Sequence, residues 1–119
     1  MPVLYNLIEI VGDSPVPITA QVWKKNFNPG ERKSGQTAFL IFNIRGITHT
    51  SVSVKVNNKL IRQIAPDPSS NASYWYTQKI ALDASLLRNG NNEVQIKAIG
   101  NPAEQFWVKN MVCFFHQFD

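Results

Sequence analysis

The sequence has a single cysteine, few glycines and no long hydrophobic run, and each shortage excludes a class of protein. Cys113 alone rules out an internal disulfide framework and any zinc or redox site built on paired cysteines. The six glycines are scattered and form neither of the glycine-rich loops that hold phosphates. No stretch approaches the roughly 18 apolar residues that span a membrane as a helix, so we expect no membrane partner.

Charge is also scarce, at 17% of residues against 44% hydrophobic. With a length of 119 residues, these fractions predict one globular domain over residues 1–119. The net charge is +4, and residues 1–60 hold seven basic and three acidic groups. The densest basic cluster brackets a turn at residues 28–30 instead of lining one face with interleaved aromatics. We therefore expect no nucleic-acid partner.

The first residues do not form a signal peptide. They lack a basic segment, and Asn6, Glu9 and Asp13 interrupt the apolar residues. We expect the chain to be made in the cytoplasm, with its final location left open.

Short β-rich runs separated by turn residues dominate the chain. Residues 51–56 alternate valine with polar residues, and Asn57-Asn58 predicts a two-residue hairpin because asparagine tolerates positive φ. Residues 66–71 predict an exposed loop, and residues 83–88 predict one helical turn. The expected strands are residues 3–11, 18–23, 37–44, 51–56, 59–64, 74–82, 93–99 and 106–118. About eight strands at this spacing predict an all-β antiparallel sandwich or barrel.

Two segments resemble a known family. Residues 54–61, V-K-V-N-N-K-L-I, are similar to the V-x-V-N-x-K-x-I hairpin of galactose-binding-domain-like jelly rolls. Residues 86–96, L-L-R-N-G-N-N-E-V-Q-I, resemble their L-x-x-G-x-N-x-V-x-I element, a turn that leads into a core strand. The resemblance covers residues 37–118 and implies an antiparallel two-sheet β-sandwich of jelly-roll type. Its motifs are structural and fix no ligand residue, and no acidic cluster matches the structural calcium site of many such modules.

Residues suited to catalysis are few. Cys113 and His116 stand three apart on an expected strand, so their side chains point to opposite faces. The acidic residues are widely spaced, whereas glycoside hydrolysis needs two that converge. We therefore expect no enzyme activity, no catalytic residue, no bound metal and no cofactor.

The best candidate for a binding site is the segment around Trp75. Because Ile80 and Leu82 should face the core, strand alternation puts Tyr74 and Tyr76 in phase with them and turns Trp75 outward. An outward tryptophan beside asparagine and serine is typical of sugar recognition, since sugar C–H faces stack on the indole while amides and hydroxyls bind the sugar hydroxyls. Two alternatives remain: Trp75 packs under the loop at residues 66–71, or a bulge reverses the register.

The expected ligand-binding residues are Trp75, Tyr74, Asn71, Ser73 and Trp107. Trp107 belongs to this set because it follows the Asn101-Pro102 loop. Arg45, Arg62 and His49 contribute polar groups only if the ends of their strands meet the site.

Three expected strands, at residues 3–11, 37–44 and 106–118, are apolar on both faces. In the last of them, strict alternation puts Val108, Val112 and Phe114 on one face. The other face then holds Trp107, Met111, Cys113 and Phe115. Because a sandwich strand normally has one wet face, a second apolar face predicts cover by a loop or by another chain. We therefore expect a homo-oligomer or an assembly partner.

Two functions follow. The leading interpretation is a non-catalytic, lectin-like carbohydrate-binding module that recognises a glycan by aromatic stacking and by hydrogen bonds from asparagine and serine. The alternative is a self-assembling structural subunit of a larger particle, such as a capsid, a fibre or an injection-type apparatus.

Overall fold

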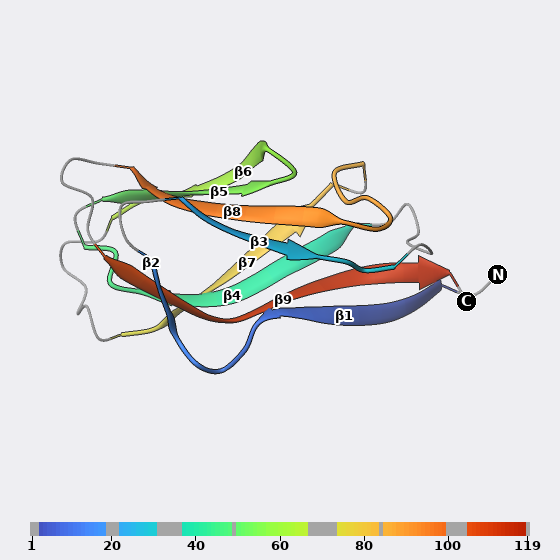
Figure 1. Ribbon diagram of the computed structural model, residues 1–119, viewed down its shortest axis with the longest axis horizontal. Coiled ribbons are helices and arrows are strands. Elements are labelled where there is room, and N and C mark those ends of the chain that lie inside the picture. Colours follow the sequence, from blue (N-terminus) through green and yellow to red (C-terminus); the bar gives the residue numbers. More distant parts are fainter. Residues whose placement is uncertain are drawn as a thin grey trace.

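The structure, a computed structural model, describes residues 3–18, 22–30, 37–48, 50–66, 74–83, 85–99 and 105–118, with backbone alone at residues 3–5, 117 and 118. These ranges contain nine strands and no helix, and the strands form two sheets that pack face to face (Figure 1). The strands are β1 (Val3–Val11), β2 (Val16–Ile18), β3 (Trp23–Phe27), β4 (Ala38–Arg45), β5 (Ser51–Val56), β6 (Lys59–Ile64), β7 (Tyr76–Leu82), β8 (Asn92–Ile99) and β9 (Phe106–Phe118).

Both sheets are antiparallel. The five-stranded sheet has the order β1-β9-β4-β7, and β2 also pairs with β9. The four-stranded sheet has the order β3-β8-β5-β6. β9 is long enough to serve two partners on one side: β2 pairs with its first residues and β1 with its last. The predicted all-β, two-sheet antiparallel sandwich is confirmed.

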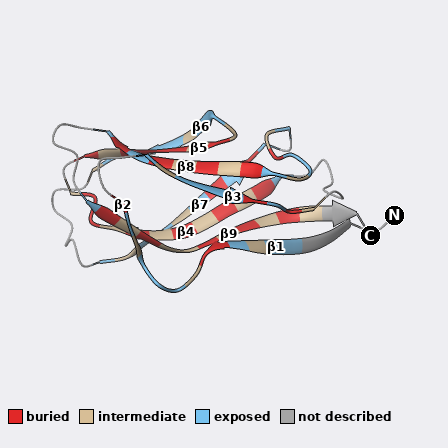
Figure 2. Cartoon of the chain, in the orientation of Figure 1, coloured by how far each residue is buried: buried red, intermediate tan, exposed pale blue. Residues whose placement is uncertain are grey.

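The core lies between the sheets and follows the period-two alternation of the strands. Buried and part-exposed residues alternate along β4 and along most of β8 (Figure 2). β4 buries Ala38, Leu40, Phe42 and Ile44 and turns Phe39, Ile41, Asn43 and Arg45 to the outer face. The valines of β5 are fully buried, as their alternation with polar residues predicts.

The hairpin between β5 and β6 is confirmed in its detail. Asn57 and Asn58 have φ angles of 50° and 67°, which is the pair of left-handed residues that a type I′ turn requires. This conformation costs asparagine less than most residues.

The predicted helical turn at residues 83–88 is instead a hydrogen-bonded turn in its described part. The Leu86 amide donates to the Asp83 carbonyl at 2.9 Å, and the Ser85 amide donates to the Asp83 carboxylate at 3.0 Å. That second bond, followed by one from the Ser85 hydroxyl, holds the pKa of Asp83 below its ordinary value. The prediction of a helical turn was wrong for the described residues, because the Asp83 side chain closes a local turn instead of capping a helix.

Two asparagine side chains join this turn to the hairpin. Asn57 Nδ2 donates to the Leu86 carbonyl and to Asn92 Oδ1, both at 2.8 Å. Asn92 also accepts from the Arg88 amide at 2.8 Å and donates to the Arg88 carbonyl at 2.9 Å. Asn57 and Asn92 are the asparagines of the two sequence motifs quoted above, so the motifs meet in space and hold each other.

The N-terminal strands differ from the prediction. Of the expected strand at residues 18–23, Ile18 ends β2 in one sheet and Trp23 begins β3 in the other, and residues 19–21 lie outside the described part. β2 contains Pro17, which is tolerated because β2 is a short strand at a sheet edge. β3 contains Lys24 and Lys25, which lie outside the expected strands. They are exposed because β3 is also an edge strand, and edge strands commonly carry lysine.

A β-bulge in β9 overturns our assignment of its two faces. Asn110 has a φ of 53°, and its amide donates to the Gly12 carbonyl at 2.8 Å. Opposite it, β4 advances two residues from Ile41 to Asn43 while β9 advances three. Because the extra residue shifts the alternation by one, Val108 joins the buried face and Trp107 the outer face. The buried residues of β9 are Phe106, Val108, Met111, Cys113 and Phe115.

Replacing Asn92 should destabilise the fold strongly. Asn92 is 1% exposed, and Asn92→Ala removes its bonds to Asn57, Arg88 and Gly90, so the part-buried backbone groups of Arg88 and Gly90 lose this partner. We expect a loss of about 2 kcal/mol in the free energy of unfolding, measured by urea denaturation. The exposed neighbour gives the control, since Asn91→Ala should change that free energy by less than about 0.5 kcal/mol. Equal midpoints for the two variants would contradict this role for Asn92.

Candidate functional site

An arginine lies between two tryptophans on the outer face of the five-stranded sheet. Arg45 ends β4, Trp107 is its register partner on β9, and Trp75 stands one residue before β7 on the other side of β4. The Arg45 guanidinium carbon is 5.0 Å from the centre of the Trp75 ring and 4.9 Å from the centre of the Trp107 ring. Three neighbouring strands thus bring a cation and two indoles into one row, here called the Trp–Arg–Trp row.

Polar groups continue this surface along the strands. The Lys109 ammonium lies 4.4 Å from the centre of the Trp75 ring, and Lys109 pairs in register with Asn43. The Thr77 hydroxyl donates to the Asn43 side-chain oxygen at 2.7 Å. The row and these neighbours together present two cations, an amide, a hydroxyl and indole surface.

Gly46 allows Trp107 to lie where it does. It has a φ of 93°, and a Cβ atom built on it would come within 3.1 Å of Trp107 Cζ3 and 3.3 Å of the Gln105 carbonyl. A side chain at this position would therefore meet both the indole and the backbone beside it. The chain turns under Trp107 directly after Arg45, which fixes the indole against the end of β4.

The structure treats the predicted site residues differently. Arg45 lies between Trp75 and Trp107 and joins the two indoles. The end of its strand therefore meets the predicted site, which was the condition for Arg45 to contribute to it. Asn71, Ser73 and His49 lie outside the described residues. Arg62 is exposed on β6 of the other sheet and does not join the row.

The two predicted inward tyrosines are not buried. Tyr74 precedes β7 and is 59% exposed, and Tyr76 is 43% exposed. Tyr76 has the expected phase, since it lines the space between the sheets, but β6 and β7 are both edge strands and leave that space open there. Tyr76 therefore has the predicted orientation, but neither tyrosine is buried in the core.

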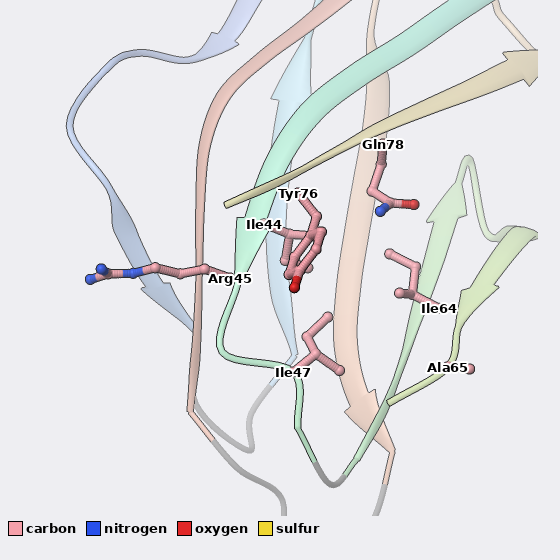
Figure 3. A pocket seen from close by; sticks show the side chains of 7 residues that line it. All are labelled: Ile44, Arg45, Ile47, Ile64, Ala65, Tyr76 and Gln78. Carbon is pink, nitrogen blue, oxygen red and sulfur yellow. The ribbon is translucent and has the colours of Figure 1, made fainter. Parts of the chain in front are cut away.

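The open edge forms a small groove of about 140 Å³ behind the row (Figure 3). Ile44, Ile47 and Ile64 make its walls, with the Tyr76 ring and the Gln78 amide on the β7 side. Figure 3 shows the Arg45 side chain running away from this groove, on the other side of β4. Arg45 also borders the groove, so the groove and the row adjoin at one end of the sandwich, while the Arg45 side chain belongs to the row.

A second depression, of about 220 Å³, lies at the opposite end. Its lining is polar and includes Asn26, Asn58, Arg88 and Glu93. Asn57 also lines it but is held by the bonds to Leu86 and Asn92 described above. This depression offers hydrogen-bonding groups but no aromatic surface among its lining residues.

The groups that could act in catalysis are apart. Cys113 points into the core and is fully buried, and burial raises the pKa of its thiol from 9.0 to about 12. His116 stands on the outer face, as their spacing predicts. Within the described ranges, no three His, Cys, Asp or Glu residues gather in a way that could hold a metal ion. In the same ranges no helix is long and apolar enough to cross a membrane.

Sequence reasoning missed Lys109 and Gly46. The Trp107-x-Lys109 alternation places both residues on one face, but strict alternation grouped Trp107 with Met111, Cys113 and Phe115 because the bulge was not foreseen. Asn110, which follows directly, is the signal that could have revealed it, since asparagine is enriched at positive φ. Gly46 after Arg45 could have marked a close approach of another side chain.

Comparison with known proteins identifies the fold. No protein-family model and no curated protein sequence matches the chain. A β-porphyranase of glycoside hydrolase family 86 from the human gut bacterium Bacteroides plebeius is similar over 98% of this chain, with a TM-score of 0.68 and 18% identity. A family 35 carbohydrate-binding module from Clostridium thermocellum is similar over 92%, with a TM-score of 0.57 and 15% identity. The chain has the galactose-binding-like jelly-roll fold.

The share of each similar protein that this chain covers differs widely. The chain spans 21% of the porphyranase's length but 98% of the family 35 module's. A variant of a family 29 carbohydrate-binding module is similar over 95% of this chain and 92% of its own, with a TM-score of 0.55 and 12% identity. The same jelly roll therefore occurs both as a separate module and as a part of a large enzyme.

The Cys113 thiol should be unreactive in the folded protein. Because its pKa is raised to about 12, it stays protonated at pH 8, and burial also blocks access. We expect a thiol-exchange reagent to label it only after denaturation. The thiol favours the folded state most below pH 9, and this contribution falls as the pH rises from 9 towards 12, because only the unfolded chain ionises there. Rapid labelling of the native protein at pH 8 would contradict this account.

Proposed function

We propose that this protein is a non-catalytic carbohydrate-binding module and that the glycan binds on the Trp–Arg–Trp row. The observation that carries the proposal is the position of Arg45 between Trp75 and Trp107 on an outer sheet face. Aromatic surface gives a sugar ring a place to stack, and the flanking donors and acceptors can bind its hydroxyl groups.

The geometry of the row suits a sugar polymer. Arg45 and Trp107 lie on adjacent strands and Trp75 directly precedes a third, so the five-stranded sheet positions these side chains. Strands in a sheet are roughly 4.8 Å apart, so the row extends across roughly 10 Å, which is the scale of two sugar units. Asn43, Thr77 and Lys109 then stand beside the sugar with hydrogen-bonding groups. Asn71 and Ser73 belong to the proposed site through the sequence argument alone.

The similar structures support a binding role without catalysis. Two of them are carbohydrate-binding modules, and each is nearly as long as this chain. The catalytic groups in the described residues do not favour an enzyme, because Cys113 is buried and protonated. The glycoside hydrolase is similar over a fifth of its own length, so its activity gives no support for catalysis here.

Replacing Trp75 should abolish glycan binding. On a glycan array followed by titration calorimetry, we expect Trp75→Ala to bind at least about tenfold more weakly than the wild type, a loss of about 1.4 kcal/mol, because the stacking surface is lost. Trp75→Phe keeps a smaller aromatic ring and should retain part of the affinity.

The matched control is at the opposite end of the sandwich. Arg88→Ala changes the second depression without touching the row, so it should leave binding unchanged. If Arg88→Ala abolished binding and Trp75→Ala did not, the site would lie in that depression and the proposed surface would be wrong.

A second candidate function, a self-associating subunit, is favoured by a different observation. On the outer face, Leu7 and Phe39 both pair in register with Phe114, and Leu7 is 51% exposed. Ile41 and Val112, half-buried on the same face, extend this apolar surface. A second copy of the chain could cover it, as the apolar strands led us to expect.

This second candidate predicts a concentration-dependent association. Analytical ultracentrifugation should detect dimers or larger species of the wild type, and Leu7→Lys should shift them towards monomer because it buries a charge at the interface. Leu60→Lys is the control, because Leu60 is 52% exposed on β6 of the other sheet. A monomeric wild type at high concentration would exclude this function.

A further inference from the structure

We propose that the glycan bound on the Trp–Arg–Trp row is anionic, and that Arg45 and Lys109 bind its sulfate or carboxylate groups. This inference rests on the proposed function and names the class of its ligand. The expected ligand is a polysaccharide that carries a negatively charged oxygen group, sulfate or carboxylate, at regular intervals.

The first reason is that the cations of this face have no carboxylate partner. Among the described residues, neither Arg45 nor Lys109 forms an ion pair, and both lie instead against indole rings. The exposed carboxylate of Glu9 belongs to the same outer face and lies against Gly12, whose carbonyl accepts from the Asn110 amide, but it forms no ion pair with Lys109. The positive charge of the row is therefore not neutralised by the described part of the chain.

The second reason is the way in which Arg45 is held. Its Nε atom is buried and has no hydrogen-bond partner among the described residues, and its guanidinium lies against two rings. Cation–π contacts on both sides orient the planar group before a ligand arrives, which lowers the entropy cost of binding. A guanidinium held in this way presents a fork of N–H donors that fits a sulfate or carboxylate in bidentate fashion.

The third reason is the cost of covering this surface with an uncharged ligand. A neutral sugar stacked on Trp75 would remove water from Arg45 and Lys109 and return only neutral hydrogen bonds. Desolvating a charge without a counter-charge is unfavourable, whereas an anionic group supplies the missing partner. The cations therefore select against neutral sugars as much as they favour charged ones.

The basic surface also continues along the sheet. The Lys79 ammonium lies 4.8 Å from the centre of the Phe39 ring, on the same outer face as Thr77. Lys79 stands four residues after Trp75, roughly 13 Å along an extended strand. A polymer with one anionic group per repeat could thus contact the row and Lys79 together, which a single anion could not.

The test compares a sulfated polysaccharide with its uncharged form, and with a second charged polymer that carries carboxylates. Affinity electrophoresis and calorimetry would measure binding of the wild type to ι-carrageenan, to chemically desulfated carrageenan and to polygalacturonate. We expect at least one charged polymer to bind about tenfold or more tightly than the desulfated one, with affinity falling as salt is raised. Carrageenan and polygalacturonate distinguish sulfate from carboxylate as the bound group.

Variants identify the cations responsible. Arg45→Gln and Lys109→Gln should each weaken binding about fivefold or more and make it less dependent on salt, because each loses one charge contact. Arg62→Gln and Lys24→Gln remove the same charges from the four-stranded sheet and should change neither quantity. Arg45→Lys keeps the charge but loses the fork, so partial loss is expected.

The possible results distinguish a failure of this inference from a failure of the proposed function. Equal binding of native and desulfated carrageenan, with loss in Trp75→Ala, would overturn this inference and leave the proposed function standing. Absence of binding to every polysaccharide would overturn both. Tighter binding of a single-stranded oligonucleotide than of any charged polysaccharide, lost in Arg45→Gln, would identify a nucleic acid as the ligand and overturn this inference.

Discussion

The extra residue at Asn110 is the constraint on which the rest of this molecule depends. β9 is the strand that touches β1, β2 and β4, so its alternation decides what each neighbour meets. With the bulge, the residues after it enter the core as Met111, Cys113 and Phe115, while the residues before it turn Trp107 and Lys109 outward. Without the shift, one half of the strand would present its apolar side to water. Core and candidate site are thus two results of one left-handed backbone angle.

Where a physical rule acts on neighbouring residues, the sequence predicts the fold well. The valines of β5 and the Asn57-Asn58 turn follow from period two and from the tolerance of asparagine for positive φ. The two segments that carry the family resemblance also meet in this structure, because Asn57 of one donates a hydrogen bond to Asn92 of the other.

The failures share a cause as well. A bulge inserts one residue and leaves the composition of the strand unchanged, so no periodicity in β9 identifies it. Lys24 and Lys25 resemble a loop because an edge strand is solvated on one side and needs no apolar face. The meeting of Arg45 with two indoles depends on strand order, which places β7 and β9 on either side of β4 and which local pattern does not contain. The sequence could therefore indicate Trp75 and Trp107 as members of the candidate site, but not that Arg45 would lie between them.

Strand direction has a consequence for how such a module can be attached to other protein. β1 begins and β9 ends side by side, with Val3 opposite Phe118, and Figure 1 shows both at one end of the sandwich. β4 ends, and β7 and β9 begin, at the other end, where Trp75, Arg45 and Trp107 lie. A host chain that carried this sandwich as an insert would hold it by two adjacent tethers at one end. The Trp–Arg–Trp row would then project away from the host, free of steric obstruction by the linkers.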